Sequence, residues 1–168
     1  MSTELQSPGG VRATLAVEAL RQSGSLRLKV WGESMLPALW PGDVVEVKHC
    51  SPQDVVAGDI VLAIRDDRFY MHRLSAFSGS GFTTRGDAMP KPDPEFPAGS
   101  LVGKVVTIER AGQLPENILC SNPRRGLLGF LLCHCGPARR LAMRLHRRHT
   151  TSTEEFPPSA SVNVGSAR

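Results

Sequence analysis

The chain has 168 residues, and 40% of them are apolar, which is enough for one domain with a sizeable core. Lys and Arg number 20 against 16 Asp and Glu, but no acidic residue occurs between Asn117 and Thr153, so the basic character belongs to the C-terminal third. No stretch approaches the roughly 18 consecutive apolar residues that a membrane span needs, which favours a cytoplasmic protein or one peripheral to a membrane.

Residues 1–10 are polar and rich in turn formers, and we expect a flexible N-terminus. They show no basic stretch followed by an apolar run, as a secretory signal would. A short amphipathic helix is predicted from Val11 to Gln22, with Gly24 where a helix C-cap would stand. Its apolar positions are Val11, Leu15, Ala19 and Leu20.

After this helix the pattern changes to short runs rich in Val and Ile, separated by turn-forming residues. The runs cover residues 26–31, 43–48, 59–64, 68–74 and 101–108. The turns between them include Pro41-Gly42-Asp43, Ala57-Gly58-Asp59, Asp66-Asp67 and 78–81. Together with the helix they predict a mainly β domain over residues 11–110.

Residues 111–149 are predicted to form a basic, partly helical extension, and residues 150–168, rich in Ser, Thr and Pro, a disordered tail. The segment 127–145 combines leucines with arginines. It either lies on an anionic membrane surface, with the leucines buried and the arginines reaching outward, or packs on the β core with an arginine-rich solvent face. Nucleic acid is not expected as a partner, because no aromatic platform or DNA-binding module accompanies the arginines.

The four cysteines match no zinc or disulfide framework, since Cys133 and Cys135 are separated by one residue and lack a second pair. We interpret them, with Cys50 and Cys120, as reduced thiols of an intracellular protein. No metal site is expected.

Ser34 is the first candidate for chemistry. It follows an apolar run and a glycine in Trp31-Gly32-Glu33-Ser34-Met35-Leu36-Pro37, where its hydroxyl would be exposed at a bend. A serine so placed acts as a nucleophile when a base lies within hydrogen-bond reach. Taken alone, the same pattern also fits a turn serine between two strands.

The blocks that follow resemble the signal peptidase family of the S24/S26 superfamily. After the serine block and Pro41-Gly42-Asp43, they are Gly58-Asp59-Ile60-Val61, His72-Arg73-Leu74, Arg85-Gly86-Asp87 and Val102-Gly103-Lys104-Val105, in family order. The resemblance implies a complex β fold of the signal-peptidase/LexA-like type, with Ser34 as the nucleophile.

The resemblance also implies that His72 is the general base. Bacterial-type enzymes and LexA-like repressors have a Lys at this strand position, whereas the branch that resembles the endoplasmic-reticulum and archaeal enzymes has His-Arg. A neutral imidazole takes the serine proton near pH 7 without the desolvation that a Lys base requires. His72 therefore needs an acidic partner more than a dry pocket.

Two acids are candidates for that partner, Asp93 in Lys91-Pro92-Asp93-Pro94 and Asp87 in Arg85-Gly86-Asp87. Both positions carry aspartates in the His-type branch. We assign the carboxylate of the triad to Asp93 and expect Asp87 to organise its turn or to share the work.

The predicted function is a serine endopeptidase of signal-peptidase type that cleaves a peptide or protein after a small residue, with no cofactor. Met35, Leu36 and Met71 would line the substrate pocket. Gly32 replaces a serine whose hydroxyl many family members place two residues before the nucleophile. The family's usual membrane helices are not visible, so a membrane-anchored partner is a further hypothesis. The alternatives are a LexA-like regulatory autoprotease and a catalytically silent peptide-binding protein.

Overall fold

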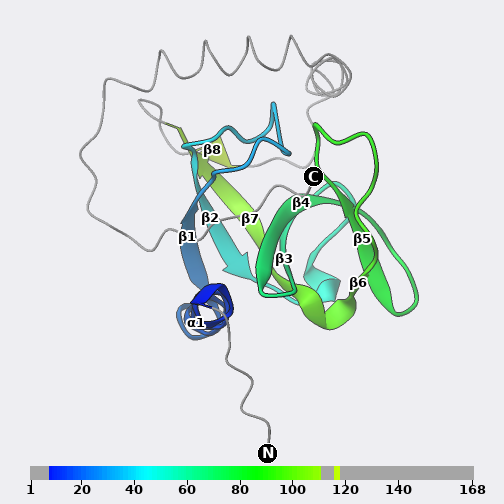
Figure 1. Ribbon diagram of the computed structural model, residues 1–168, viewed down its shortest axis with the longest axis horizontal. Coiled ribbons are helices and arrows are strands. Elements are labelled where there is room, and N and C mark those ends of the chain that lie inside the picture. Colours follow the sequence, from blue (N-terminus) through cyan, green and yellow to red (C-terminus); the bar gives the residue numbers. More distant parts are fainter. Residues whose placement is uncertain (1–7, 111–115, 118–168) are drawn as a thin grey trace, which may run out of the picture.

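The computed structural model describes residues 8–110 and 116–117 (Figure 1). One α-helix, two 3₁₀ turns and eight strands make up these residues. In chain order they are α1 (Pro8–Ser23), β1 (Ser25–Lys29), β2 (Val44–His49), η1 (Pro52–Asp54), β3 (Ile60–Arg65), β4 (Arg68–Phe77), β5 (Gly81–Arg85), β6 (Phe96–Pro97), η2 (Ala98–Ser100), β7 (Leu101–Glu109) and β8 (Glu116–Asn117). Residues 1–7 of the expected flexible N-terminus, most of the basic extension and the tail lie outside the described residues, whereas residues 8–10 belong to the first turn of α1.

The strands form one antiparallel sheet in the order β1-β2-β7-β3-β4-β5-β6, with β8 added beside β7. This confirms the mainly β fold, which agrees with the signal-peptidase/LexA-like architecture. The five predicted runs correspond to β1, β2, β3, β4 and β7, whereas β5, β6 and β8 were not predicted.

Two of the predicted turns share one construction. Asp43 accepts a hydrogen bond from the backbone N–H of Trp40, and Asp59 accepts one from Val56 three residues earlier. The glycine before each aspartate, Gly42 or Gly58, has φ +100°, a conformation that side chains other than glycine rarely adopt. Each turn therefore ends just before a strand with its aspartate buried.

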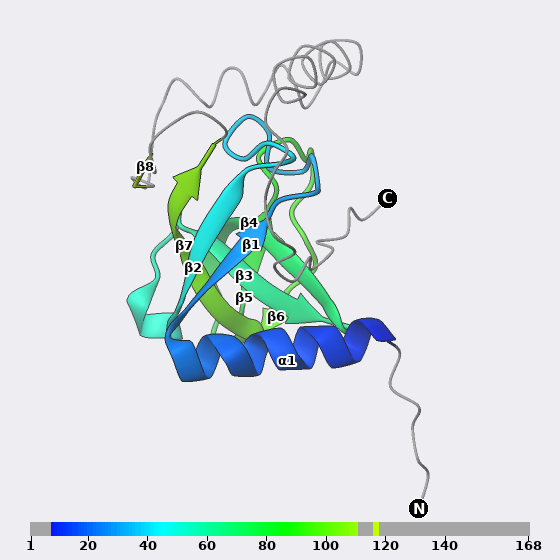
Figure 2. The same cartoon turned by 90° about the vertical axis from the view of Figure 1, so that its left-hand side faces the viewer.

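Helix α1 lies across one end of the sheet (Figure 2). Gly24 ends it with φ +75° and a hydrogen bond from its N–H to the carbonyl of Leu20, as the sequence predicted. Of the predicted apolar positions, Leu20 is buried as expected, but Leu15 is 63% exposed and Ala19 is exposed. The helix also buries Ala13, with Ala16 and Val17 partly buried between Ala13 and Leu20. Within the described part, no helix is long and apolar enough to cross a membrane.

The core has two clusters, one on each face of β3. Ile60 and Leu62 pack with α1, β1, β2 and β7, while Val61 and Ala63 face a second cluster that is formed with Phe82 and Phe96 of β5 and β6 and with residues of β4, β7 and the β2–β3 connection. Successive side chains of a strand point to opposite faces, so β3 contributes to both clusters. β4 beside it has the same alternation, with Met71 facing the first cluster and His72 the other face of the strand.

Candidate active site

Ser34 lies in the connection between β1 and β2, in a turn over residues 34–38. The residues after it anchor this turn, because Met35 and Leu36 are 2% and 0% exposed. The N–H of Leu39 also donates to the carbonyl of Met35. Ser34 itself is only partly buried. The apolar anchor therefore fixes the turn and leaves the serine hydroxyl near the surface.

The backbone of Ser34 is also held from outside, by the loop after β5. The N–H of Ala88 donates to the carbonyl oxygen of Ser34 over 2.8 Å. Gly86 approaches so closely that a Cβ built on it would lie 2.6 Å from the same oxygen. A side chain at position 86 would collide with Ser34, so this position requires glycine.

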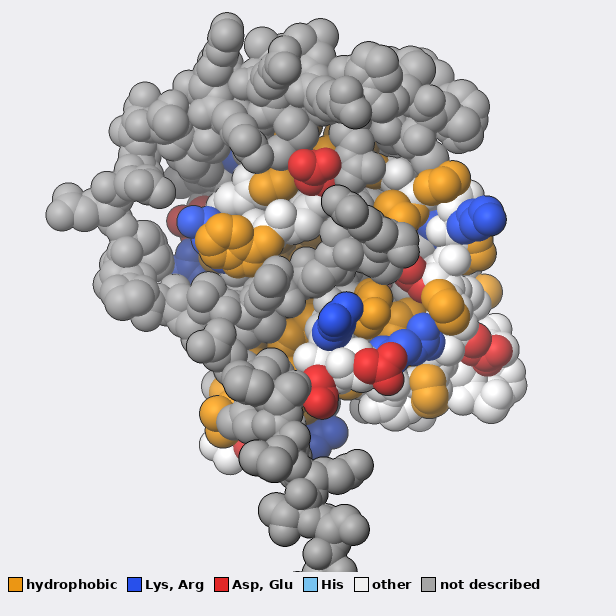
Figure 3. All heavy atoms as spheres, in the orientation of Figure 1, with side chains coloured by type: hydrophobic (Ala, Val, Ile, Leu, Met, Phe, Trp, Pro, Cys, Tyr) orange, Lys and Arg blue, Asp and Glu red, His pale blue; other side chains and the backbone are white. Residues whose placement is uncertain are grey.

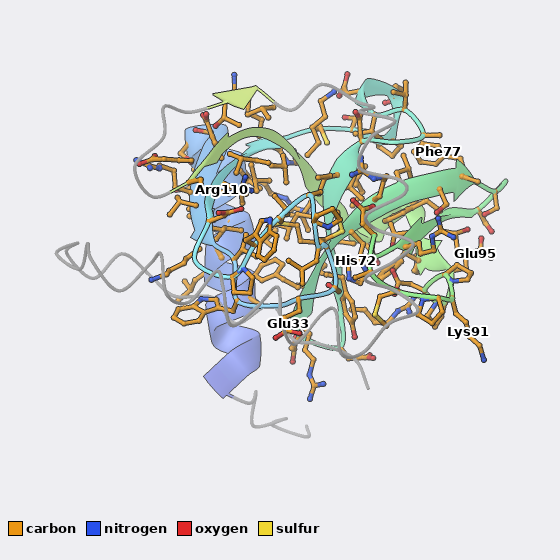
Figure 4. The ribbon with its side chains drawn as sticks, turned by 90° about the horizontal axis from the view of Figure 1, so that it is seen from above. Glu33, His72, Phe77, Lys91, Glu95 and Arg110 are labelled. Carbon is orange, nitrogen blue, oxygen red and sulfur yellow. The ribbon has the colours of Figure 1, made fainter. Side chains whose placement is uncertain are left out.

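His72 lies in β4, opposite Val61 of β3, and is 6% exposed. Its Nε2 lies 2.8 Å from the Oγ of Ser34. Figure 4, seen from above the molecule, labels His72 and also Glu33, the residue before Ser34. A neutral imidazole at this distance accepts the serine proton through Nε2 when Nδ1 carries its own proton.

Asp93 provides the partner for that second nitrogen. Its Oδ2 lies 2.6 Å from the Nδ1 of His72, and it also accepts a 2.6 Å hydrogen bond from the hydroxyl of Thr84. Burial tends to raise the pKa of Asp93, but these two hydrogen bonds and the electrostatic influence of His72 and Arg65 hold that pKa below its ordinary value. Asp93 is therefore ionised at neutral pH and favours the tautomer of His72 that accepts at Nε2.

Asp87, the other candidate acid, pairs with Arg73. The two side chains form a double hydrogen bond, 2.8 Å from Nε to Oδ1 and 2.6 Å from Nη2 to Oδ2. Arg73 also donates to the carbonyl of Gly58. Of the two aspartates, Asp93 is thus the one that the structure places against His72, while Asp87 joins β4 to the loop that supports Ser34.

The residues predicted to line the substrate pocket are buried. Met35 and Met71 belong to the core cluster that includes α1, and Leu36, which follows Met35 in the sequence, is fully buried. Met71 lies on the face of β4 opposite to that of His72. Their part in binding a substrate stays a prediction.

Two residues of the site were not found from the sequence, Thr84 and Arg65. Thr84 touches the acid directly, and Arg65 donates to the carbonyls of Pro94 and Glu95, just after it. The signal for Thr84 would have been its place on a strand, but β5 was not predicted. Among the described residues, no group of three or more His, Cys, Asp and Glu side chains is arranged to hold a metal ion.

A comparison with models of protein families identifies the family of this chain. The profile of the family described as Peptidase S24-like matches residues 10–106, which include Ser34, His72 and Asp93. A comparison with curated proteins finds no match. Because the matched region covers more than half of the chain, the chain belongs to the Peptidase S24-like family.

Proposed function

We propose that this protein is a serine endopeptidase of signal-peptidase type, with Ser34 as nucleophile, His72 as general base and Asp93 as the acid that orients the base. The observation that carries the proposal is the unbroken hydrogen-bond chain from the Oγ of Ser34 through both nitrogens of His72 to Asp93, with links of 2.8 and 2.6 Å. A nucleophile, a base and an orienting group within hydrogen-bond reach define this kind of site by geometry.

The reaction proceeds by acyl transfer. The Oγ of Ser34 attacks the carbonyl carbon of the scissile peptide bond while the Nε2 of His72 takes the serine proton. His72 then returns this proton to the nitrogen of the leaving amine as the C–N bond breaks. A water molecule, deprotonated by His72 in turn, attacks the resulting ester and releases the acid product and free Ser34. The ionised Asp93 stabilises the imidazolium in both halves of the reaction.

The backbone N–H of Ser34 is the first donor that we assign to the developing oxyanion. Gly32 offers no hydroxyl as a second one. We further propose that the substrate is an extended peptide with a small residue before the cleaved bond. Met35 and Leu36, buried directly after Ser34, are the residues that we propose to lie beneath this small side chain, whereas Met71 faces the side of β4 away from His72.

The test is cleavage of an extended peptide library by the purified chain and by Ser34→Ala and His72→Ala. We expect each change to lower kcat/KM by at least about a thousandfold, because the two groups act as one unit. Ser75→Ala and His49→Gln, at exposed positions of β4 and β2, are matched controls and should retain full activity.

A folded chain that cleaves no member of the library would contradict the proposal and favour a peptide-binding function. Cleavage confined to the chain itself, and lost in Ser34→Ala, would instead favour a regulatory autoprotease. Turnover that survives both active-site substitutions would show that the activity comes from elsewhere.

A further inference from the structure

Thr84 lies in β5 and is 1% exposed, one of few buried polar side chains in the described part. Its hydroxyl donates to the Oδ2 of Asp93 over 2.6 Å. The Nδ1 of His72 lies at the same distance from the same oxygen. A single carboxylate oxygen thus receives two short hydrogen bonds, one from the base and one from the threonine.

The backbone around Asp93 is fixed as well. Its N–H donates to the carbonyl of Thr84 over 2.8 Å, so the two residues are joined by both main chain and side chain. Pro92 and Pro94 flank the aspartate, and a residue before proline is restricted to extended conformations. Arg65 donates to the carbonyl of Pro94 over 3.1 Å and holds the chain beyond it.

These constraints place the backbone of Asp93 but leave the rotation of its carboxyl group free. That rotation is set by the hydrogen bonds at Oδ2, and Thr84 is the donor that does not take part in proton transfer. A terminal carboxylate torsion is broad and is not fixed by rotamer preference alone. The buried hydroxyl therefore determines which way the carboxylate faces before and during the transfer of a proton to His72.

We propose that Thr84 is a positioning residue that extends the chain Ser34, His72 and Asp93 by a fourth group and keeps the Oδ2 of Asp93 aimed at the base. The expected effect of Thr84 on the rate of cleavage rests on the proposed peptidase function. Its expected effect on the titration of Asp93 does not depend on any activity. The charged or titratable groups that act on Asp93 are His72 from β4 and Arg65 from β3, and Thr84 adds the neutral donor from β5.

The experiment compares Thr84→Val, which has nearly the same shape but no hydroxyl, with Thr84→Ser, which keeps the hydroxyl. Thr83→Val is the matched control, because Thr83 is the neighbouring residue on the opposite face of β5. The first measurement is the carboxyl titration of Asp93 by NMR, which needs no substrate. Thr84→Val should raise the pKa of Asp93, since the lost hydrogen bond is one that lowers it, whereas Thr84→Ser and Thr83→Val should leave it unchanged.

The second measurement is peptide cleavage. Loss of a hydrogen bond to a charged group lowers a rate by roughly 10- to 100-fold, so kcat should fall by that factor in Thr84→Val while KM changes little. Thr84→Ser should restore the activity. An unchanged Asp93 titration in a folded Thr84→Val protein would overturn the inference, as would an unchanged kcat. If the wild type titrates as expected but cleaves nothing, the proposed function fails while the titration still decides the role of Thr84.

Discussion

Gly86 packs so closely against Ser34 that a methyl group added at position 86 would displace the serine. The Cβ of an alanine there would lie 2.6 Å from the carbonyl oxygen of Ser34 and 3.1 Å from its Cβ. Since both atoms belong to the residue that must meet His72, we expect Gly86→Ala to displace the Oγ of Ser34. Misplacing a reacting group by about 1 Å can cost about a hundredfold, so kcat/KM for peptide cleavage should fall by about that factor.

Gly99→Ala is the control for this prediction, because a Cβ at Gly99 meets nothing within 4 Å. Its kcat/KM should equal that of the wild type. Thermal unfolding of both variants separates displacement of Ser34 from general loss of the fold. A folded Gly86→Ala protein with wild-type kcat/KM would show that the loop after β5 moves to accommodate the methyl group and that Ser34 keeps its position.

At the residue scale, the sequence pointed to Ser34 and His72 as a pair because each lies in a distinctive block. It favoured Asp93 over Asp87 as the partner of His72, but both acids follow the same strand, so only three-dimensional placement shows which of them meets the base. The structure puts Asp93 there and pairs Asp87 with Arg73. Thr84 was not predicted as a site residue, because a threonine in a short polar run does not by itself indicate a catalytic role.

The Arg73–Asp87 pair connects two elements, β4 and the loop that supports Ser34. Both side chains are mostly buried, with exposed fractions of 26% and 16%, and they meet through two hydrogen bonds. We expect Asp87→Asn to lower the free energy of unfolding by about 2 kcal/mol, because it removes the negative charge that meets the partly buried guanidinium of Arg73 through two hydrogen bonds. Urea unfolding of the variant and the wild type measures this difference.

The ion pair of Arg27 and Glu109 is the control for that measurement. Its side chains are 55% and 43% exposed, and an exposed pair of this kind contributes less than about 1 kcal/mol. Glu109→Gln should therefore change stability much less than Asp87→Asn. Equal effects of the two substitutions would mean that Asp87 is only a surface charge.

At the scale of the elements, strands with a continuous apolar signal were predictable and short polar ones were not. β2, β3, β4 and β7 are rich in Val, Ile or aromatic residues, whereas β5 reads Gly-Phe-Thr-Thr-Arg and β6 is a Phe-Pro pair. β5 and β6 exist because Phe82 and Phe96 stack in the second core cluster, with ring centroids 5.4 Å apart. Such a contact between distant residues has no counterpart in local sequence. The helix was predicted over most of its length, but of its predicted face Leu20 is buried and Leu15 is exposed, and the small residues Ala13 and Ala16 pack toward the sheet in its place.

At the scale of the whole molecule, the described part and the rest of the chain differ in their charge. On the face seen in Figure 3, acidic, basic and apolar side chains of the described residues are intermixed. The acid-free stretch of the sequence, between Asn117 and Thr153, contains the run of arginines. An attraction of this protein to an anionic surface should therefore come from that stretch rather than from this face of the β domain.

We propose that segment 127–145 brings the protein to anionic membranes, and the arginines in it provide the test. Each basic residue near an anionic bilayer contributes about 1 kcal/mol, so replacing three of them with Gln should weaken binding roughly a hundredfold. The segment's arginines are Arg139, Arg140 and Arg144, and a control with the same net charge replaces Arg27, Arg68 and Arg85, which are exposed in the β domain.

Sedimentation of full-length protein with vesicles of phosphatidylserine and phosphatidylcholine measures the affinity, which should fall as salt is raised because charge attraction is screened. Equal binding by the two triple variants would locate the attraction outside this segment, and no binding by the wild type at low salt would favour the interpretation in which the leucines pack on the β core.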